Sequence, residues 1–289
     1  MDHRILAINF PRVARVACLL VFALASTCCV LARAQDQDQL GPNPAAQTGP
    51  QGVITMTAVP NRPTFSTTAE TVQTGVFEIE YGLEAAQGHQ NINGLLKFGL
   101  FKNFELRFGN NPIERDAGVA GRGDSGAGLK YRFLEERGPL PTISILYNAT
   151  LPTATAGLGS RSLGHSAGIL VSKDLGKHHV DFNESLQWIG RPGASGFDRD
   201  YFTALSYSHP VTEKLGFAAE IAGFSRANLA TPSMLTILQA LTFNISARLV
   251  IDSGCYVAAR GDLPRITFFS GVTYSVLDLY RYLRLTHRR

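Results

Sequence analysis

The sequence predicts an all-β fold, a transmembrane antiparallel up-and-down β-barrel of about 12 strands. Apolar and polar residues alternate with a period of two over most of the chain after residue 74. Tight turns and longer loops alternate between these segments, which is typical of outer-membrane barrels. The polar face carries many charges, which a closed barrel can hold in its lumen. A soluble β-sandwich, with a dry core and a wet outer face, is the alternative.

Residues 1–34 have the features of a cleaved secretory signal peptide. Basic residues precede an unbroken apolar run at 16–30, and the small residues of a cleavage site follow at 32–34. A membrane anchor is the alternative, but the run is shorter than the ~20 apolar residues that a spanning helix needs. We therefore expect export from the cytoplasm, with Gln35 as the first residue of the mature chain.

Cleavage changes the charge and the cysteine content of the chain. The mature chain keeps 23 basic and 22 acidic side chains, so it is close to neutral and offers no basic surface for nucleic acid. Only Cys255 remains, which excludes an internal disulfide. The mature chain opens with residues rich in Gln, Pro, Gly and Ala, and we expect 35–73 to be a flexible N-terminal segment.

The barrel is expected over residues 74–276, with a basic C-terminal tail at 277–289. The twelve alternating segments are 75–84, 91–100, 103–110, 125–134, 141–151, 164–173, 178–189, 200–209, 214–224, 233–243, 248–258 and 264–276. The tight turns are at 101–102, 135–140, 174–177, 210–213 and 244–247, and the longer loops at 85–90, 111–124, 152–163, 190–199, 225–232 and 259–263. Each segment is near the ~9–11 residues that a tilted strand needs to cross a bilayer.

Charged and amide side chains on the polar face are the predicted pore-lining residues. An unpaired Lys or Arg that faces lipid at mid-membrane costs about 2–4 kcal/mol, so these side chains should face the lumen and pair there. Both signs of charge are present with a slight acidic excess, which predicts weak cation selectivity. The predicted pore-lining residues are Glu78, Glu80, Lys97, Glu105, Arg107, Lys130, Arg132, Asp181, Asn183, Glu220 and Asp252.

Several blocks of the chain resemble one known family. They are NRPTFST at 61–67, TGVFEIE at 74–80, LLKFGL at 95–100, NFELR at 103–107, GLKYRFLEE at 128–136, TLPT at 150–153 and HPVTEKLG at 209–216. Together they resemble the outer-membrane barrel family labelled as phenol-degradation (meta-pathway) transporters. The resemblance implies a channel-like role in the uptake of aromatic or other hydrophobic compounds. The tail at 277–289 is a departure, because such barrels usually end on an aromatic residue of the last strand.

Three sequence features that could suggest chemistry have simpler interpretations. The pair His178-His179 flanks a turn and is expected on the solvated surface rather than in a metal site. His165-Ser166 lacks the nucleophile elbow of a hydrolase, and the glycines at 157–164 open no helix that could bind a nucleotide. We therefore expect no catalytic residue, no metal site, no cofactor and no enzymatic activity.

The expected function is a channel or transporter in a bacterial outer membrane for small solutes, aromatic or hydrophobic ones included. Its expected partners are outer-membrane lipid and the solute, and we expect a monomer that binds no nucleic acid. Selectivity would come from a charged lumen, narrowed by the N-terminal segment or an inward-folded loop. The alternative is a barrel without transport, either a membrane-bound hydrolase or a structural or adhesive protein. A plugged lumen would favour that alternative.

Overall fold

The computed structural model describes residues 56–286, apart from 192, 229–232 and 262–263. The expected signal peptide at 1–34 and residues 35–55 of the expected flexible segment lie outside the described residues. No helix of the described residues is both long and apolar enough to cross a membrane.

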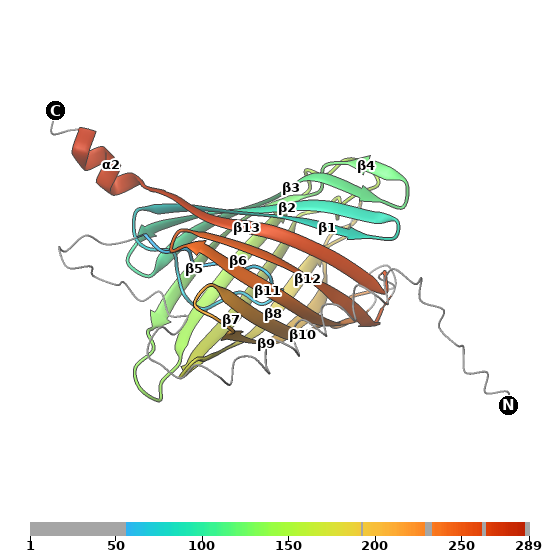
Figure 1. The fold of residues 1–289 in the computed structure, drawn as a ribbon. Coiled ribbons are helices and arrows are strands. Elements are labelled where there is room, and N and C mark those ends of the chain that lie inside the picture. Colours follow the sequence, from blue (N-terminus) through green and yellow to red (C-terminus); the bar gives the residue numbers. More distant parts are fainter. Residues whose placement is uncertain (1–55, 192, 229–232, 262–263, 287–289) are drawn as a thin grey trace. The chain divides into compact units, whose positions relative to one another are not determined.

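Thirteen strands and one helix make up the regular structure of the described residues (Figure 1). In chain order the strands are β1 (Val76–Ala86), β2 (His89–Phe101), β3 (Phe104–Asp116), β4 (Val119–Gly121), β5 (Ser125–Leu134), β6 (Thr142–Leu151), β7 (Gly164–Leu175), β8 (His178–Gly190), β9 (Phe197–Pro210), β10 (Leu215–Phe224), β11 (Met234–Ser246), β12 (Leu249–Arg260) and β13 (Ile266–Asp278). The helix, α2 (Leu279–Thr286), follows the last strand directly.

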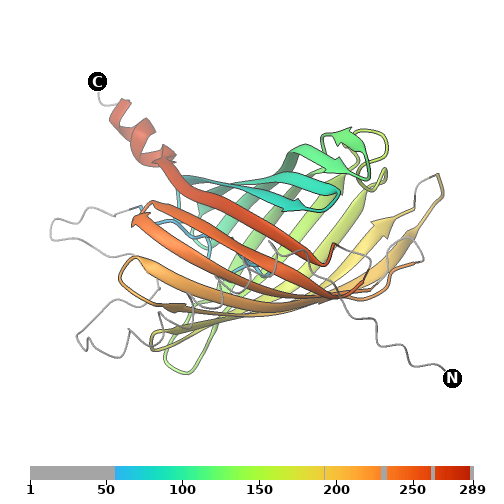
Figure 2. The same cartoon turned by 45° about the vertical axis from the view of Figure 1, so that its right-hand side comes forward.

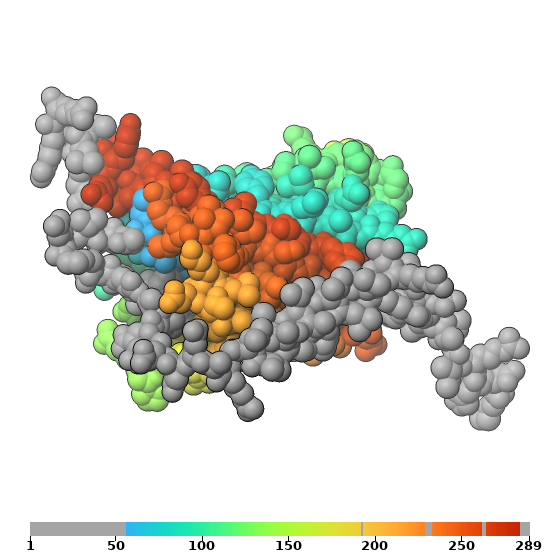
Figure 3. Space-filling view, in the orientation of Figure 1, coloured from blue at the N-terminus to red at the C-terminus, as the bar shows by residue number. Residues whose placement is uncertain are grey.

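The strands form one closed antiparallel sheet. Each long strand pairs with its neighbours along the chain, and β1 pairs with β13, with Gly82 opposite Gly271. The short β4 pairs with the end of β3, so twelve strands make up the wall. In the space-filling view, β1 in blue-green and β13 in red lie side by side (Figure 3). The predicted twelve-stranded up-and-down barrel is confirmed, and the two-sheet sandwich is excluded.

The two faces of the wall differ in the way that the alternation predicts. Apolar side chains of the outer face are exposed, for example Ile169 at 53% and Ile237 at 48%. Charged side chains of the inner face are buried, and Lys97 and Lys130 are among the largest fully buried side chains. This is the reverse of a soluble protein, in which Lys is almost never fully buried. The outer face therefore suits lipid and the inner face suits polar partners.

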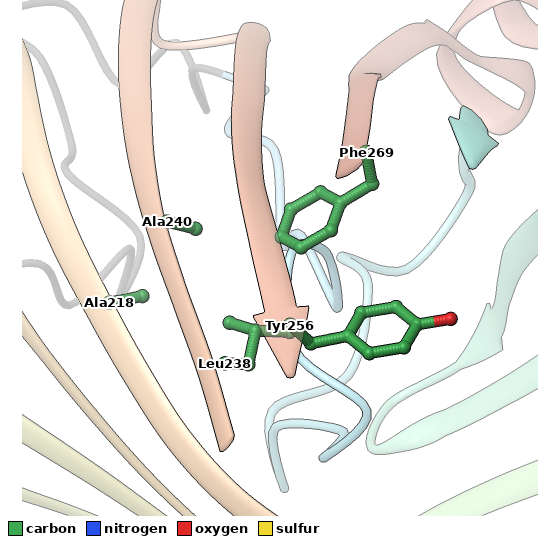
Figure 4. Packing of buried hydrophobic residues seen from close by; sticks show 5 residues of the cluster. All are labelled: Ala218, Leu238, Ala240, Tyr256 and Phe269. Carbon is green, nitrogen blue, oxygen red and sulfur yellow. The ribbon is translucent and has the colours of Figure 1, made fainter. Parts of the chain in front are cut away.

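The inner face also has an apolar side, on the neighbouring strands β10 to β13. Phe65, which precedes the first strand, packs against it, and its ring meets the Tyr256 ring edge-on at 5.1 Å between centroids. Figure 4 shows the residues of this cluster, which are Ala218, Leu238, Ala240, Tyr256 and Phe269.

The ends of the barrel differ in several places from the sequence prediction. The expected loop at 85–90 is a turn, since β1 runs to Ala86 and β2 begins at His89, and β9 begins at Phe197 within the expected loop at 190–199. β13 continues to Asp278 rather than ending at 276, because Leu277 and Asp278 still pair with the first residues of β1. The tail at 277–289 therefore begins as strand and continues as the helix α2. The expected loop at 111–124 is largely strand, since β3 runs to Asp116 and pairs there with β4.

Candidate functional site

Residues 56–73, which we call the lumen segment, lie inside the barrel (Figure 2). The segment enters beside the β11–β12 turn, where the Ala58 amide donates to the Ala247 carbonyl at 2.8 Å. It leaves beside β2, where the Gly75 amide donates to the Gly99 carbonyl at 2.7 Å. Both points lie at the end of the barrel that has the short turns. Between them the segment bonds to side chains of nine wall strands, β1, β2, β3, β5, β6, β7, β8, β10 and β12.

Four buried glutamates of the wall accept hydrogen bonds from backbone amides of the lumen segment. They stand on β1, β3 and β10, so they hold the segment at points spread around the lumen. Hydrogen bonds to a charged acceptor are about twice as strong as neutral ones. The distances from amide nitrogen to carboxylate oxygen are 2.9 Å for Val59 and Glu78, 3.0 Å for Asn61 and Glu80, 2.6 Å for Ser66 and Glu220, and 2.8 Å for Val72 and Glu105.

Other wall side chains bind the carbonyl groups of the lumen segment. The Lys130 ammonium donates to the carbonyls of Thr68 and Glu70. The Asn183 amide group makes a pair of bonds with the backbone of Thr67, accepting from its N–H at 2.7 Å and donating to its carbonyl at 2.9 Å. The segment has no strand ladder of its own, and these side chains satisfy its backbone in place of a ladder.

Lys97 is the centre of a buried ion cluster under the first part of the segment. Its Nζ lies 2.6 Å from a Glu78 oxygen, contacts Glu80, and donates to the Val59 carbonyl at 2.5 Å. All three charged side chains are at most 2% exposed. Because an unpaired buried charge costs several kcal/mol, each member of this cluster depends on the others.

A second buried ion cluster lies on the next two strands of the wall, β3 and β5. The Arg107 Nη1 donates to Glu105 at 2.9 Å, and the Lys130 Nζ lies 3.6 Å from the other oxygen of Glu105. Taken together, the two clusters set three glutamates against three cations. This part of the lumen is therefore balanced in charge.

Arg62 extends from the lumen segment to the wall near the middle of the barrel. Its Nε and Nη2 donate to the two Asp252 oxygens, each at 3.2 Å, and its Nη1 donates to Asn93 at 2.9 Å. The guanidinium lies over the paired glycines Gly82 and Gly271, where an added Cβ would come within 2.1 Å of it. Only glycine at positions 82 and 271 leaves room for the Arg62 guanidinium in this place.

A cavity of about 270 Å³ remains beside the lumen segment. Its wall residues, such as Glu84 and Asn93, are nearer to the long loops than the Lys97 cluster is, so the cavity lies on that side of the segment. The rings of Phe65, Tyr256 and Phe269 form an apolar side. On the polar side, the Arg107 Nε and the Asn61 Oδ1 are buried and have no hydrogen-bond partner among the described residues. The cavity is therefore lined by polar residues, Asn61, Arg62 and Arg107, next to aromatic rings.

The structure places the predicted pore-lining residues on the inner face of the wall. Ten are buried and Arg132 is half-buried, and most of them bind the lumen segment or one another rather than open solvent. Arg132 contacts Glu70 of the segment. Asp181 accepts from Ser172 at 2.5 Å and from Ser206 at 3.3 Å.

Sequence reasoning missed several charged residues of the lumen, including Arg62, Glu70, Glu84 and Asp200. Arg62 was assigned to the flexible segment at 35–73, although the block NRPTFST around it was part of the family resemblance. Asp200 is 2% exposed and accepts from Ser225 at 2.8 Å. On β9 both faces carry apolar residues, so alternation does not assign Asp200 to the inner face.

The histidines lie differently from the sequence expectation. His178 is exposed, as expected, and stacks on Tyr207 and His209 near the short turns. His179 is half-buried instead, because it bonds to Asp174 at 2.5 Å and to Asp181 at 3.0 Å. His165 lies beside Tyr147 near the long loops, with its Nδ1 2.6 Å from the tyrosine hydroxyl.

Comparison with known proteins gives structural likeness alone. No known family and no curated protein matches the sequence. An outer-membrane channel from Pseudomonas putida F1 is similar with a TM-score of 0.54 and 14% identity over 73% of this chain and 99% of its own. The NanC porin gives 0.53 and 9% over 69% of this chain and 100% of its own. The KdgM porin, solved with oligogalacturonate, gives 0.51 and 11% over 69% and 99%. At these identities the likeness shows the fold.

Proposed function

We propose that the protein is a bacterial outer-membrane channel for small solutes, with a lumen narrowed by residues 56–73. The observation that carries the proposal is the cavity beside the lumen segment, with aromatic rings on one side and polar groups on the other. A solute that enters from the long-loop end meets this cavity before the segment. The fold shared with porins and with the P. putida channel supports the same function.

The lining of the cavity favours small solutes that combine an apolar body with a polar group. Phe65, Tyr256 and Phe269 can pack against an apolar ring or chain. The polar residues that line the cavity, Asn61, Arg62 and Arg107, can bind a hydroxyl or carbonyl group. Aromatic compounds with such groups are the solute class that we propose, in agreement with the family resemblance.

One observation points to the alternative, a barrel without transport. The lumen segment bonds to nine wall strands and so fills much of the lumen. Purified protein in planar bilayers and in liposomes distinguishes the two. We expect single-channel conductance, and uptake of a hydroxylated aromatic probe that is faster than in protein-free liposomes. Absence of both would reject the channel and leave the structural or enzymatic barrel.

The orientation in the membrane is a separate prediction. We expect the long loops to face the outside of the cell and the short turns to face the periplasm. In a Cys255→Ala background, Ala117→Cys and Ser195→Cys on the long loops should react with an impermeant thiol reagent on whole cells. Lys102→Cys and Glu213→Cys on the short turns should react only after lysis. Labelling of the short turns on intact cells would show that the short turns face the outside and that the predicted orientation is wrong.

Ion selectivity tests the role of Arg62. Replacing Arg62 with Gln leaves the buried Asp252 without its cation, so the cavity becomes more negative. The reversal potential in a KCl gradient should shift toward cation selectivity, with a permeability ratio changed on the order of twofold. Arg137→Gln removes the same charge from the exposed β5–β6 turn and serves as the control. An equal shift in both variants would mean that Arg62 does not act from within the lumen.

A further inference from the structure

The helix α2 begins at the rim of the barrel, at the end with the short turns. The Asp278 carboxylate accepts from the Arg281 amide at 2.9 Å and so caps the helix. The Leu279 amide donates to the Gly75 carbonyl at 2.7 Å, which ties the helix start to the beginning of β1. Both views of the chain show α2 continuing past the end of β13 (Figures 1 and 2).

Tyr280 fixes the first turn of the helix against the wall. Its hydroxyl donates to the Leu100 carbonyl at 2.6 Å, and its ring meets the Phe98 ring edge-on at 5.8 Å between centroids. The helix is thus held at the outer edge of the sheet rather than below the lumen.

The remaining helix has an apolar side and a basic side. Leu279, Tyr282 and Leu283 have the spacing of one helix face, and Tyr282 and Leu283 are 60% and 43% exposed. Arg281 is exposed and has the spacing of the other side, and the sequence has a second arginine, Arg284, three residues later. The sequence from 279 to 289 contains no acidic residue and ends in His-Arg-Arg. A short helix with exposed apolar residues and only positive charge is typical of segments that lie in a membrane interface.

The adjacent outer wall is apolar at the same level. Phe101, in the last position of β2, is 52% exposed and stacks on Phe104 at 4.6 Å between centroids. Phe243 and Ile245, near the end of β11, are also exposed. The apolar side of α2 can therefore continue the lipid-facing surface of the wall.

We propose that α2 lies in the membrane interface at the short-turn end and binds anionic phospholipid headgroups through its arginines. The apolar side of α2 continues the lipid-facing wall, and the charge of its basic side is complementary to phosphate groups. This contact fixes the barrel's height and tilt in the bilayer, and it does not depend on solute passage. Because the attraction is between exposed charges and lipid phosphate, salt should weaken it.

A fluorescent label at the exposed apolar position tests the proposal in the full mature chain. Leu283→Cys with Cys255→Ala is labelled with an environment-sensitive dye and placed in vesicles of phosphatidylcholine, with or without phosphatidylglycerol. We expect blue-shifted emission and quenching by nitroxide lipids, both stronger with phosphatidylglycerol and reduced at high salt. The double reversal Arg281→Glu and Arg284→Glu should reduce both signals severalfold.

The matched control reverses two exposed charges on short turns at the same end, Lys102→Glu and Arg137→Glu, and should leave both signals unchanged. Circular dichroism confirms that each variant is folded. The proposal fails if the signals are the same with and without phosphatidylglycerol and after the reversal in α2. It also fails if the emission is blue-shifted without lipid quenching, because the helix would then pack on the barrel or on a second copy.

Discussion

Replacing Lys97 with Met should destabilise the barrel by about 3–5 kcal/mol, the usual cost of removing one partner from a buried ion pair. Glu78 and Glu80 are at most 2% exposed, and the substitution removes the cation that they share. It also removes the donor to the Val59 carbonyl. The effect is measured by urea unfolding of the protein in lipid vesicles.

Two further variants make this result interpretable. Lys102→Met removes the same side chain from the exposed β2–β3 turn and should change stability by less than about 0.5 kcal/mol. Adding Glu78→Gln and Glu80→Gln to Lys97→Met removes the uncompensated charges and should restore much of the loss. A Lys97→Met protein as stable as the parent would show that water reaches this cluster freely.

Deleting the lumen segment should raise single-channel conductance severalfold. The deletion is practical because the two ends of the segment lie close together, with the Thr57 amide 3.3 Å from the Gln73 side chain. A short glycine link from Thr57 to Gln73 therefore removes 58–72 without displacing β1. The wall glutamates lose their amide donors, but water can enter the vacated lumen and replace them.

The deletion variant is compared with the full mature chain in the same bilayers and salt. A rise in conductance together with weaker solute discrimination supports a constriction made by the segment. If the conductance stays at the parent value in a folded variant, another element closes the lumen and the proposed role of residues 56–73 is wrong.

The sequence predicted the wall well because lipid and lumen impose opposite requirements on alternating residues. Where one face is charged, as around Glu105 and Arg107, the alternation assigns both the strand and the inward face. Where both faces are apolar, as at Phe202 on β9, it assigns the strand without the face. The cluster at Ala218 and Leu238 shows that an apolar inner face is present as well.

The lumen segment could not be found from periodicity. Its bonds run mostly from its backbone to wall side chains, for example from Thr67 to Asn183, and backbone groups are the same in every sequence. Its composition resembles that of a flexible linker, although 56–73 is bound along its length. Periodicity therefore predicts partners for Lys97 and Lys130 on the wall alone, whereas half of their partners belong to the segment.

The lumen segment is a ligand that the barrel carries on its own chain. A short covalent tether keeps such a ligand at an effective concentration of about millimolar, whatever the concentration of the protein. In the proposed channel, a solute that displaces the segment would have to compete with a permanently present neighbour, and we expect the segment to rebind after the solute has passed. A synthetic peptide of residues 56–73 should block the deletion variant only at concentrations near that tethered value.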